Sequence, residues 1–209
     1  RSGVGKFILV DDDLVCLTNS NRQLHATRKT IGRPKVEVMK ERILDINPKA
    51  EVETYRLFYL PETGEKLLDG EIDYIVDAID TVTAKLDLIV KARERGIPII
   101  SSMGTGNKFD PARLEITDLS KTSVDPLARV MRKELRARGI TSLKVLFSGE
   151  KPSETIENDD TSCKEGCVCP KGAARKCTDR RNIPGSTAFV PPVGGLIIAS
   201  EVVRDLIGK

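Results

Sequence analysis

The sequence predicts an α/β protein with a doubly wound, mainly parallel sheet. Short apolar runs alternate along the chain with segments of helical periodicity, which is typical of strand–helix–strand units. The chain of 209 residues has no Trp and only 4% aromatic residues, so its core must be built from Val, Ile and Leu. Such a core suits strands that are buried on both faces. The 39% of hydrophobic residues exclude a disordered, collagen-like or coiled-coil chain.

Six segments are predicted as strands. Most are short apolar runs bounded by charged or turn residues, as is typical of buried strands, whereas Val52–Tyr59 alternates. In chain order they are Phe7–Val10, Val52–Tyr59, Tyr74–Ile79, Ile97–Ser101, Leu114–Thr117 and Leu143–Phe147.

Four segments are predicted as helices from the spacing of their apolar residues and from the residues that stop a helix. Gly96 and Gly139 end the second and the third of them. The helices are the segment from Pro34 to the stop at Asn47, then Thr81–Arg95, Pro126–Arg138 and Gly194–Ile207.

We expect residues 1–209 to form a single domain with an irregular insertion at 149–187, a long Cys-containing loop near the C-terminus. This segment is rich in Gly, Pro, Lys and Asp and shows little periodicity. The first strand predicted within this sequence, Phe7–Val10, follows Arg1–Lys6 directly, and Gly3 resembles the glycine that follows the end of a helix. We therefore expect the first strand, a glycine-rich loop and the first helix of the fold upstream of Arg1.

The charge and the cysteines predict a cytoplasmic protein. The net charge of +3 is too small to establish a nucleic-acid partner. Four of the five cysteines fall within fifteen residues, and such a cluster in a chain without a signal peptide indicates a reducing compartment. The longest uncharged stretch, Asn182–Ser200, holds three Pro and three Gly, so we expect no membrane span.

Acidic residues follow two predicted strands, at the ends where doubly wound sheets bind their ligands. Asp11 and Asp13 follow the first strand, and Asp80 comes after the third strand, just before Thr81. The Asp11 carboxylate could accept hydrogen bonds from a ribose, or it could cap a helix or lie in a solvated turn. Asp80 could hold magnesium on phosphates or cap the helix that starts near Thr81.

Polar and cationic side chains between these points suit a nucleoside triphosphate. They are Asn19, Asn21, Arg22 and Lys35. A dinucleotide does not need them, because helix N-terminal amides hold its pyrophosphate. An enzyme that cleaves a triphosphate does, since fixed Arg and Lys groups stabilise charge on the leaving pyrophosphate. Surface charge would equally account for any one of these residues.

Together these residues resemble the ThiF/MoeB superfamily of adenylating enzymes, which have a Rossmann-like fold and are related to ubiquitin-activating enzymes. The resemblance covers Lys6–Asp205. The motifs that carry it are LVDDD at 9–13, TNSNRQ at 18–23, GRPK at 32–35, INP at 46–48 and DAIDT at 77–81.

The resemblance implies that the protein binds ATP and magnesium and that a carboxylate attacks the α-phosphate to form an acyl-adenylate. Asp11 would bind the ribose, and Asp80 would serve the magnesium and the α-phosphate region. The phosphates would be bound by Asn19, Asn21, Arg22 and Lys35. Asp13 and Thr81 lie beside these residues in the same motifs and belong to the expected nucleotide site.

Within the superfamily the chain looks like the TcdA group, the tRNA threonylcarbamoyladenosine dehydratases. The segments that carry this resemblance include NRQLHA at 21–26, MGTG at 103–106 and ITDLSKTSVDPL at 116–127. Members of the group activate the threonyl carboxylate of a modified adenosine in the tRNA anticodon loop, and intramolecular attack closes a ring with net loss of water. A nucleophile held in the same substrate has a high effective concentration, so the scheme is chemically sound.

A basic segment at residues 121–144 could meet tRNA phosphates. It holds seven Lys and Arg residues against Asp125 and Glu134. The solvated face of an amphipathic helix would explain the same pattern, because Leu127, Val130, Met131 and Leu135 form an apolar stripe.

The cysteine cluster has three competing interpretations. Cys163, Cys167, Cys169 and Cys177 could form a structural zinc site. Alternatively, Cys177 resembles a cysteine in a mobile loop of the TcdA group, and its cationic neighbours would favour a reactive thiolate. The thiols could also be incidental.

We therefore expect an ATP-dependent tRNA dehydratase whose catalytic residues are Arg22, Lys35, Asp80 and Cys177. A homodimer and sulfur-relay protein partners are expected by resemblance only. The alternative is an enzyme that adenylates the C-terminal glycine of a ubiquitin-like sulfur carrier. A Rossmann dehydrogenase would have no use for Arg22 and Lys35, and a non-catalytic relative would lack the glycine-rich loop.

Overall fold

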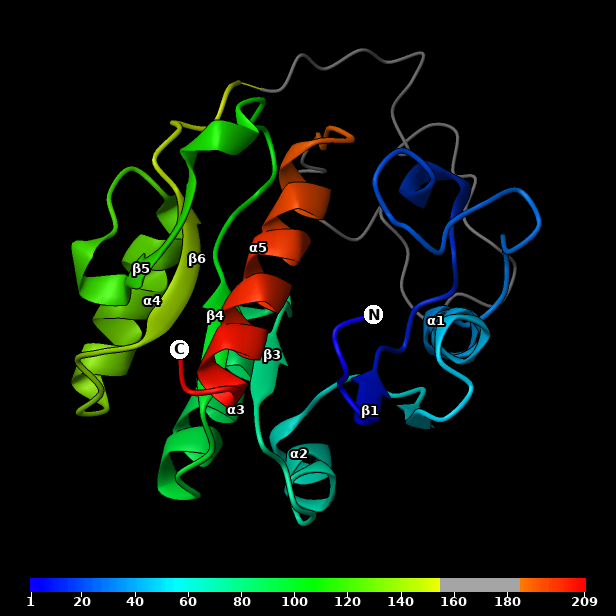
Figure 1. Cartoon of the computed structure of the whole chain (residues 1–209). Coiled ribbons are helices and arrows are strands. Elements are labelled where there is room, and N and C mark those ends of the chain that lie inside the picture. Colours follow the sequence, from blue (N-terminus) through cyan, green and yellow to red (C-terminus); the bar gives the residue numbers. More distant parts are fainter. Residues whose placement is uncertain (155–184) are drawn as a thin grey trace. The chain divides into compact units, whose positions relative to one another are not determined.

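The computed structural model describes residues 1–154 and 185–209 and confirms a mainly parallel α/β protein (Figure 1). Contacts divide the described residues into two compact units, Arg1–Tyr59 and Leu60–Glu154 with Gly185–Lys209. Each unit is described by itself. That all 209 residues form one domain stays a prediction.

The first unit is built on a two-stranded parallel sheet, in which β1 (Lys6–Val10) pairs with β2 (Glu51–Tyr55). Helix α1 (Lys35–Ile46) connects the two strands, as parallel pairing requires. Between β1 and α1 lies a long loop with one short 3-10 helix, η1 (Leu17–Asn19). A small core ties this loop to α1 and consists of Val15, Ala26 and Val38.

The second unit contains a four-stranded sheet with the order β3-β4-β6-β5. The first three strands in this order are parallel, and β5 is antiparallel to β6. Their bounds are Ile75–Asp77 for β3, Ile99–Ser102 for β4, Leu114–Asp118 for β5 and Lys144–Ser148 for β6. The helices are α2 (Pro61–Leu67), α3 (Val82–Glu94), α4 (Pro126–Ala137) and α5 (Val190–Leu206), with short 3-10 turns η2 (Pro111–Arg113) and η3 (Leu119–Lys121).

Helices cover both faces of this four-stranded sheet, which confirms the doubly wound arrangement (Figure 1). Helix α5 packs Val190 and Ile198 against Ile100 of β4 and Leu146 of β6. Because side chains alternate along a strand, Ser101 points to the opposite face, where Asp77 of β3 and Lys85 of α3 meet. Helix α4 packs beside α3.

Several boundaries differ from the sequence prediction. The strand expected to run to Tyr59 ends at Tyr55, where the Leu57 amide donates to the Tyr55 carbonyl and turns the chain out of the sheet. The strand expected to run from Tyr74 to Ile79 spans only residues 75–77. The physical reason is a turn in which the Asp77 carboxylate accepts from the Ile79 amide.

Prolines explain two differences between the predicted and the observed helices. Helix α2 was not expected, and it begins at Pro61, whose fixed φ suits a first helical position. Helix α5 begins at Val190 and not at Gly194, because Pro191 and Pro192 fit in the first turn, where an amide has no partner within the helix. The described parts of the expected insertion, residues 149–154 and 185–187, hold neither helix nor strand, and residues 155–184 lie outside the described residues.

Within residues 1–154 and 185–209, no helix combines the length and the apolar character that crossing a bilayer would need.

Gly194 lets α5 approach the sheet closely. A Cβ atom at this position would lie 2.8 Å from Cδ2 of Leu146, which is 1% exposed. The next residue, Gly195, has nothing within 4 Å of the corresponding point. The two adjacent glycines of one helix therefore differ in whether packing tolerates a methyl group.

We expect Gly194→Ala to be less stable than Gly195→Ala by about 1–3 kcal/mol, because only the first methyl overpacks the core. Both substitutions gain the same helix propensity, so each serves as the control of the other. Urea unfolding of the two variants measures the difference. Equal midpoints would show that Leu146 moves aside without cost.

Candidate functional site

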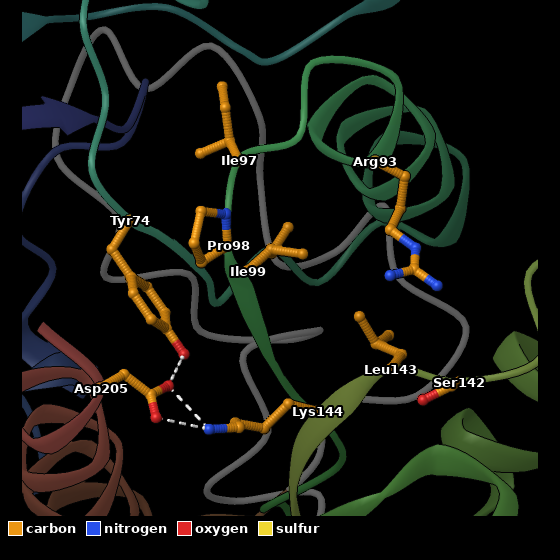
Figure 2. Close-up of a pocket in the computed structure, with 9 residues that line it drawn as sticks. All are labelled: Tyr74, Arg93, Ile97, Pro98, Ile99, Ser142, Leu143, Lys144 and Asp205. Atoms are coloured by element: carbon orange, nitrogen blue, oxygen red, sulfur yellow. Dashed lines mark hydrogen bonds and ion pairs between the residues drawn. The ribbon is translucent and has the colours of Figure 1, made fainter. Parts of the chain in front are cut away.

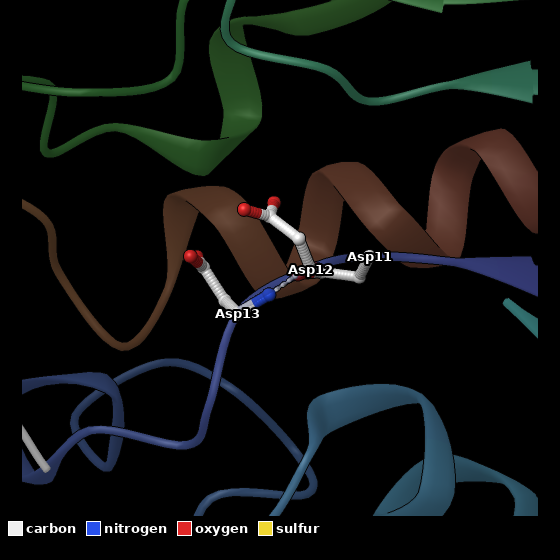
Figure 3. Close-up of side chains that lie close together, drawn as sticks. All are labelled: Asp11, Asp12 and Asp13. Atoms are coloured by element: carbon white, nitrogen blue, oxygen red, sulfur yellow. Dashed lines mark hydrogen bonds between the residues drawn. The ribbon is translucent and has the colours of Figure 1, made fainter. Parts of the chain in front are cut away.

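Three consecutive aspartates follow β1 at the carboxyl end of the two-stranded sheet (Figure 3). The Asp11 amide extends the pairing with β2 by donating to the Tyr55 carbonyl. The Asp11 carboxylate then accepts from the Asp13 amide at 2.8 Å, which turns the chain. One carboxylate oxygen from each of Asp11, Asp12 and Asp13 lies within 4.8 Å of the others. The turn proposed for Asp11 is present, and it leaves the second carboxylate oxygen outside this bond.

Lys35 brings a buried cation to these carboxylates. The residue is only 9% exposed, and its Nζ lies 2.7 Å from Oδ2 of Asp13 and 3.8 Å from Oδ2 of Asp11. Its amide also donates to the Asp13 carbonyl. Surface charge is therefore the wrong interpretation of Lys35, since a buried ammonium needs a partner.

The backbone fixes Lys35 at the first position of α1. An antiparallel bridge joins Leu14 to Pro34, the Val15 amide donates to the Arg33 carbonyl, and the Gly32 amide donates to the Val15 carbonyl. The segments before and after the long loop are thus clamped side by side. This clamp places the ammonium of α1 at the carboxyl end of β1.

The local charges shift two pKa values. Burial raises the pKa of Asp11, while the nearby Lys35 ammonium opposes this shift. Burial lowers the pKa of His25, and the Lys35 charge lowers it further. Lys35 therefore favours an ionised Asp11 and a neutral His25 in the same unit.

The other predicted phosphate ligands gather on η1 and on the turn that follows it. Asn19 Oδ1 accepts from the Cys16 amide at 3.0 Å, which fixes the start of the turn. Arg22 Nη1 donates to the Thr18 carbonyl at 3.2 Å and to Asn21 Oδ1 at 3.0 Å. The structure thus brings Asn19, Asn21 and Arg22 together on one turn, and it brings Asp11, Asp13 and Lys35 together beside β1.

Asp80 and Thr81 belong to the second unit. Asp80 is exposed and lies three residues after the last residue of β3. Thr81 is the N-cap residue of α3, and its side chain makes no capping hydrogen bond. The N-cap position of α3 thus belongs to Thr81 and not to Asp80, whose carboxylate follows the carboxyl end of a parallel strand as the magnesium hypothesis requires. That Asp80 meets Arg22 and Lys35 around one nucleotide stays a prediction.

A buried ion pair that the sequence analysis missed supports the turn before Asp80. Asp77 and Lys85 both have side chains that are 0% exposed, and Nζ of Lys85 lies 2.9 Å from Oδ2 of Asp77. Ser101 of β4 donates to the same oxygen at 2.6 Å, and the Ile79 amide donates to the other oxygen at 3.1 Å. The signal in the sequence was an aspartate inside an apolar strand, which needs a cation.

A second buried pair lies at the carboxyl end of β4. Lys108 donates at 2.8 Å to the Asp125 carboxylate and at 2.8 Å to the Gly104 carbonyl. The other Asp125 oxygen accepts from the Ala128 amide and caps α4. A Cβ atom on Gly104 would lie 2.9 Å from Asp125, so this glycine of the MGTG motif is required by packing.

A cavity of about 320 Å³ lies at the opposite, amino end of the four-stranded sheet (Figure 2). Its polar groups already bind one another: Tyr74 donates to Asp205 at 2.6 Å, and Lys144 donates to Asp205 at 2.7 Å. Because this network is internally satisfied and lies at the end of the four-stranded sheet opposite to Asp80, we assign the cavity no ligand.

The cysteine predictions lie outside the described residues. They concern Cys163, Cys167, Cys169 and Cys177, as a zinc site or as a reactive thiol. Cys16, which is described, is buried, and its sulfur accepts a hydrogen bond from the Thr18 hydroxyl at 3.3 Å.

Comparison with known proteins agrees with this arrangement. All of residues 1–209 match the model of the ThiF family. The chain is 46% identical to the tRNA threonylcarbamoyladenosine dehydratase of Bacillus subtilis, over 99% of this chain and 79% of the relative. By contrast, the sulfur carrier protein ThiS adenylyltransferase of Escherichia coli is 30% identical over 50% of this chain and 41% of its own length.

Solved structures give the same result. The tRNA N6-threonylcarbamoyladenosine dehydratase TcdA of E. coli, in complex with AMP, superimposes with a TM-score of 0.82 and 30% identity. The match covers 99% of this chain and 78% of the other. The complex of the same enzyme with ATP has a TM-score of 0.79 and 31% identity, over 99% and 77% of the two chains. These matches confirm the expected Rossmann-like fold.

We expect Lys85→Met to destabilise the protein by about 3–5 kcal/mol, because it leaves the Asp77 carboxylate buried without its cation. The double variant Asp77→Asn/Lys85→Met removes both charges and should recover a large part of this loss. Urea unfolding of the single and the double variant measures the coupling. A double variant less stable than Lys85→Met would contradict the assignment of the pair as a charge-neutralising contact.

Proposed function

The chain belongs to the ThiF family, and we propose that it catalyses the ATP-dependent dehydration of threonylcarbamoyladenosine in tRNA. Similarity to dehydratases over almost the whole chain supports this reaction. The structural observation that carries the proposal is the buried ammonium of Lys35, held against Asp13 and Asp11 at the carboxyl end of β1. Such a fixed cation at a ligand-binding edge suits a triphosphate.

The reaction balances as two transfers. The threonyl carboxylate attacks the α-phosphate of ATP, the α–β phosphoanhydride bond breaks, and pyrophosphate leaves. A nucleophile of the same modified nucleoside then attacks the activated carbonyl carbon, loses its proton and expels AMP. The oxygen lost from the carboxylate departs with AMP, so the tRNA loses the elements of one water. ATP and AMP, the substrate and the product, are the ligands found in the E. coli enzyme.

Each residue of the first unit has a distinct part. The Asp11 oxygen outside the turn accepts from the ribose hydroxyls, as a carboxylate after a strand of a nucleotide-binding sheet does. Lys35 supplies a compact charge to the phosphates, and Asp13 holds it in place. The Arg22 guanidinium, oriented by Thr18 and Asn21, stabilises the charge that develops on the leaving pyrophosphate.

Magnesium fits the donor set that follows β3. The exposed Asp80 carboxylate and the Thr81 hydroxyl, which makes no capping bond, offer the oxygen ligands that this ion prefers. When bound, the ion neutralises phosphate charge. The ion pair of Asp77 with Lys85 and the hydrogen bond of Asp77 to the Ile79 amide fix the backbone turn that precedes Asp80.

Homodimerisation and a sulfur-relay partner remain predictions from resemblance. Zinc binding and a reactive Cys177 are hypotheses about residues outside the described part of the chain.

We expect the full-length protein, incubated with ATP, magnesium and threonylcarbamoylated tRNA, to yield a nucleoside lighter by one water, together with AMP and pyrophosphate. Nucleoside mass analysis and nucleotide chromatography measure the products. A ubiquitin-like sulfur carrier that stimulates ATP–pyrophosphate exchange, with no effect of the tRNA, would instead support carrier adenylation.

We expect Arg22→Ala and Asp80→Asn each to lower kcat about 100-fold or more, because each removes a fixed charge from the phosphates or from their metal. Arg28→Ala and Asp73→Asn are the matched controls, since both residues are exposed and belong to the same units. Circular dichroism checks the fold, and the dehydration assay measures the rate. Wild-type turnover in Arg22→Ala or Asp80→Asn would remove that residue from the mechanism.

A further inference from the structure

Helix α4 carries a row of three exposed cations on its outer face. We name Arg129, Lys133 and Arg136 the basic stripe. At 100° per residue they fall within an arc of about 60°, and they span about 10 Å along the helix axis. The buried residues Ala128, Met131 and Leu135 lie on the other side of α4. The stripe is therefore a surface that packing within the unit does not use.

Other cations of the basic 121–144 segment differ from the basic stripe, because they bind groups of the protein itself. Arg132 donates to the carbonyls of Leu119 and Thr122 and holds the loop before α4. Arg138 pairs with Glu134 of its own helix. Lys144 pairs with acidic residues of α5. These three cations have structural partners.

No carboxylate within residues 1–154 and 185–209 lies within ion-pair distance of a stripe residue. Glu134, the one acidic residue inside α4, projects about 100° or more away from all three and binds Arg138. The stripe thus combines high positive charge with the absence of local neutralisation in the described structure.

The stripe begins at the carboxyl end of the four-stranded sheet, where the proposed magnesium ligand Asp80 also lies. Lys108 anchors Asp125, the N-cap of α4, to Gly104 just after β4. Arg129 follows Asp125 by about one helical turn. Asp80 follows β3, and β3 is parallel to β4, so both elements leave the sheet at its carboxyl end. The row of cations therefore runs away from this end along the outside of the same unit.

We propose that the basic stripe binds the phosphate backbone of the tRNA substrate; this inference rests on the proposed function. Arg and Lys bind phosphate oxygens, and a row without acidic neighbours suits a polyanion that continues beyond the reacting nucleoside. Such contacts carry little sequence information and position the nucleic acid. The stripe would hold the stem while the modified nucleoside enters the reaction site.

The test compares two triple variants of equal charge. Arg129→Gln/Lys133→Gln/Arg136→Gln removes the stripe. Arg42→Gln/Lys49→Gln/Lys66→Gln is the control, because it removes three exposed cations from other elements. Circular dichroism checks both folds. Binding of threonylcarbamoylated tRNA is measured from about 50 to about 200 mM salt, where phosphate contacts dominate the affinity.

We expect the stripe variant to raise the Kd and the KM for tRNA about tenfold or more and to reduce the log–log salt slope by about 2–3. The KM for ATP and the kcat at saturating tRNA should stay near the wild-type values. The control variant should bind tRNA within about twofold of wild type, with an unchanged slope.

Unchanged tRNA affinity in the stripe variant would overturn the inference, as would equal losses in both variants, which would indicate a general charge effect. A loss of affinity for an acidic carrier protein, with tRNA binding intact, would overturn it in favour of a protein partner. A wild-type enzyme that binds tRNA through the stripe but forms no dehydrated nucleoside would refute the proposed function and leave the RNA contact in place.

Discussion

A buried ammonium needs a carboxylate partner, and this requirement organises the strand ends in both units. Lys35 meets Asp13 after β1, Lys85 meets Asp77 at the end of β3, and Lys108 meets Asp125 beside β4. In each case the lysine comes from a different segment than the carboxylate. Each pair therefore fixes a turn that packing of apolar side chains alone would leave free to move, and these are the turns that present the proposed ligand groups.

The same rule separates structural charges from functional ones. Charges that fold the chain are buried and ion-paired, as Asp77 is with Lys85. Charges proposed to meet substrate are exposed or half-buried, as Asp80 and Arg22 are. Lys35 falls between the two groups, because it neutralises Asp13 and still lies next to the Asp11 carboxylate. Such a residue contributes to stability and to binding, so its loss would affect both.

Much of the fold followed from the sequence, because apolar runs and helix stops are local signals. The strand predicted from Ile97 and the helix ended by Gly96 both appear, with small shifts at their ends. Helix α2 was missed because its seven residues include a proline and a glycine and show no apolar period. The predicted candidates Asp11, Asn19 and Arg22 lie in ordered turns. The burial of Lys35, Lys85 and Lys108 could not be predicted, because it depends on distant segments. Asp77 in an apolar strand indicated that some cation was needed, but not which one.

The reversed direction of β5 affects how the four-stranded sheet ends. β5 is its last strand on that side, bounded by the turns η2 and η3, and it carries the exposed Glu115. The carboxylate of Asp118, at its end, is bound by Ser142 and the Leu143 amide. A short edge strand that carries a charged side chain and is bounded by turns at both ends is a poor template for the addition of a strand from another molecule. We therefore expect this side of the sheet to resist edge-to-edge aggregation.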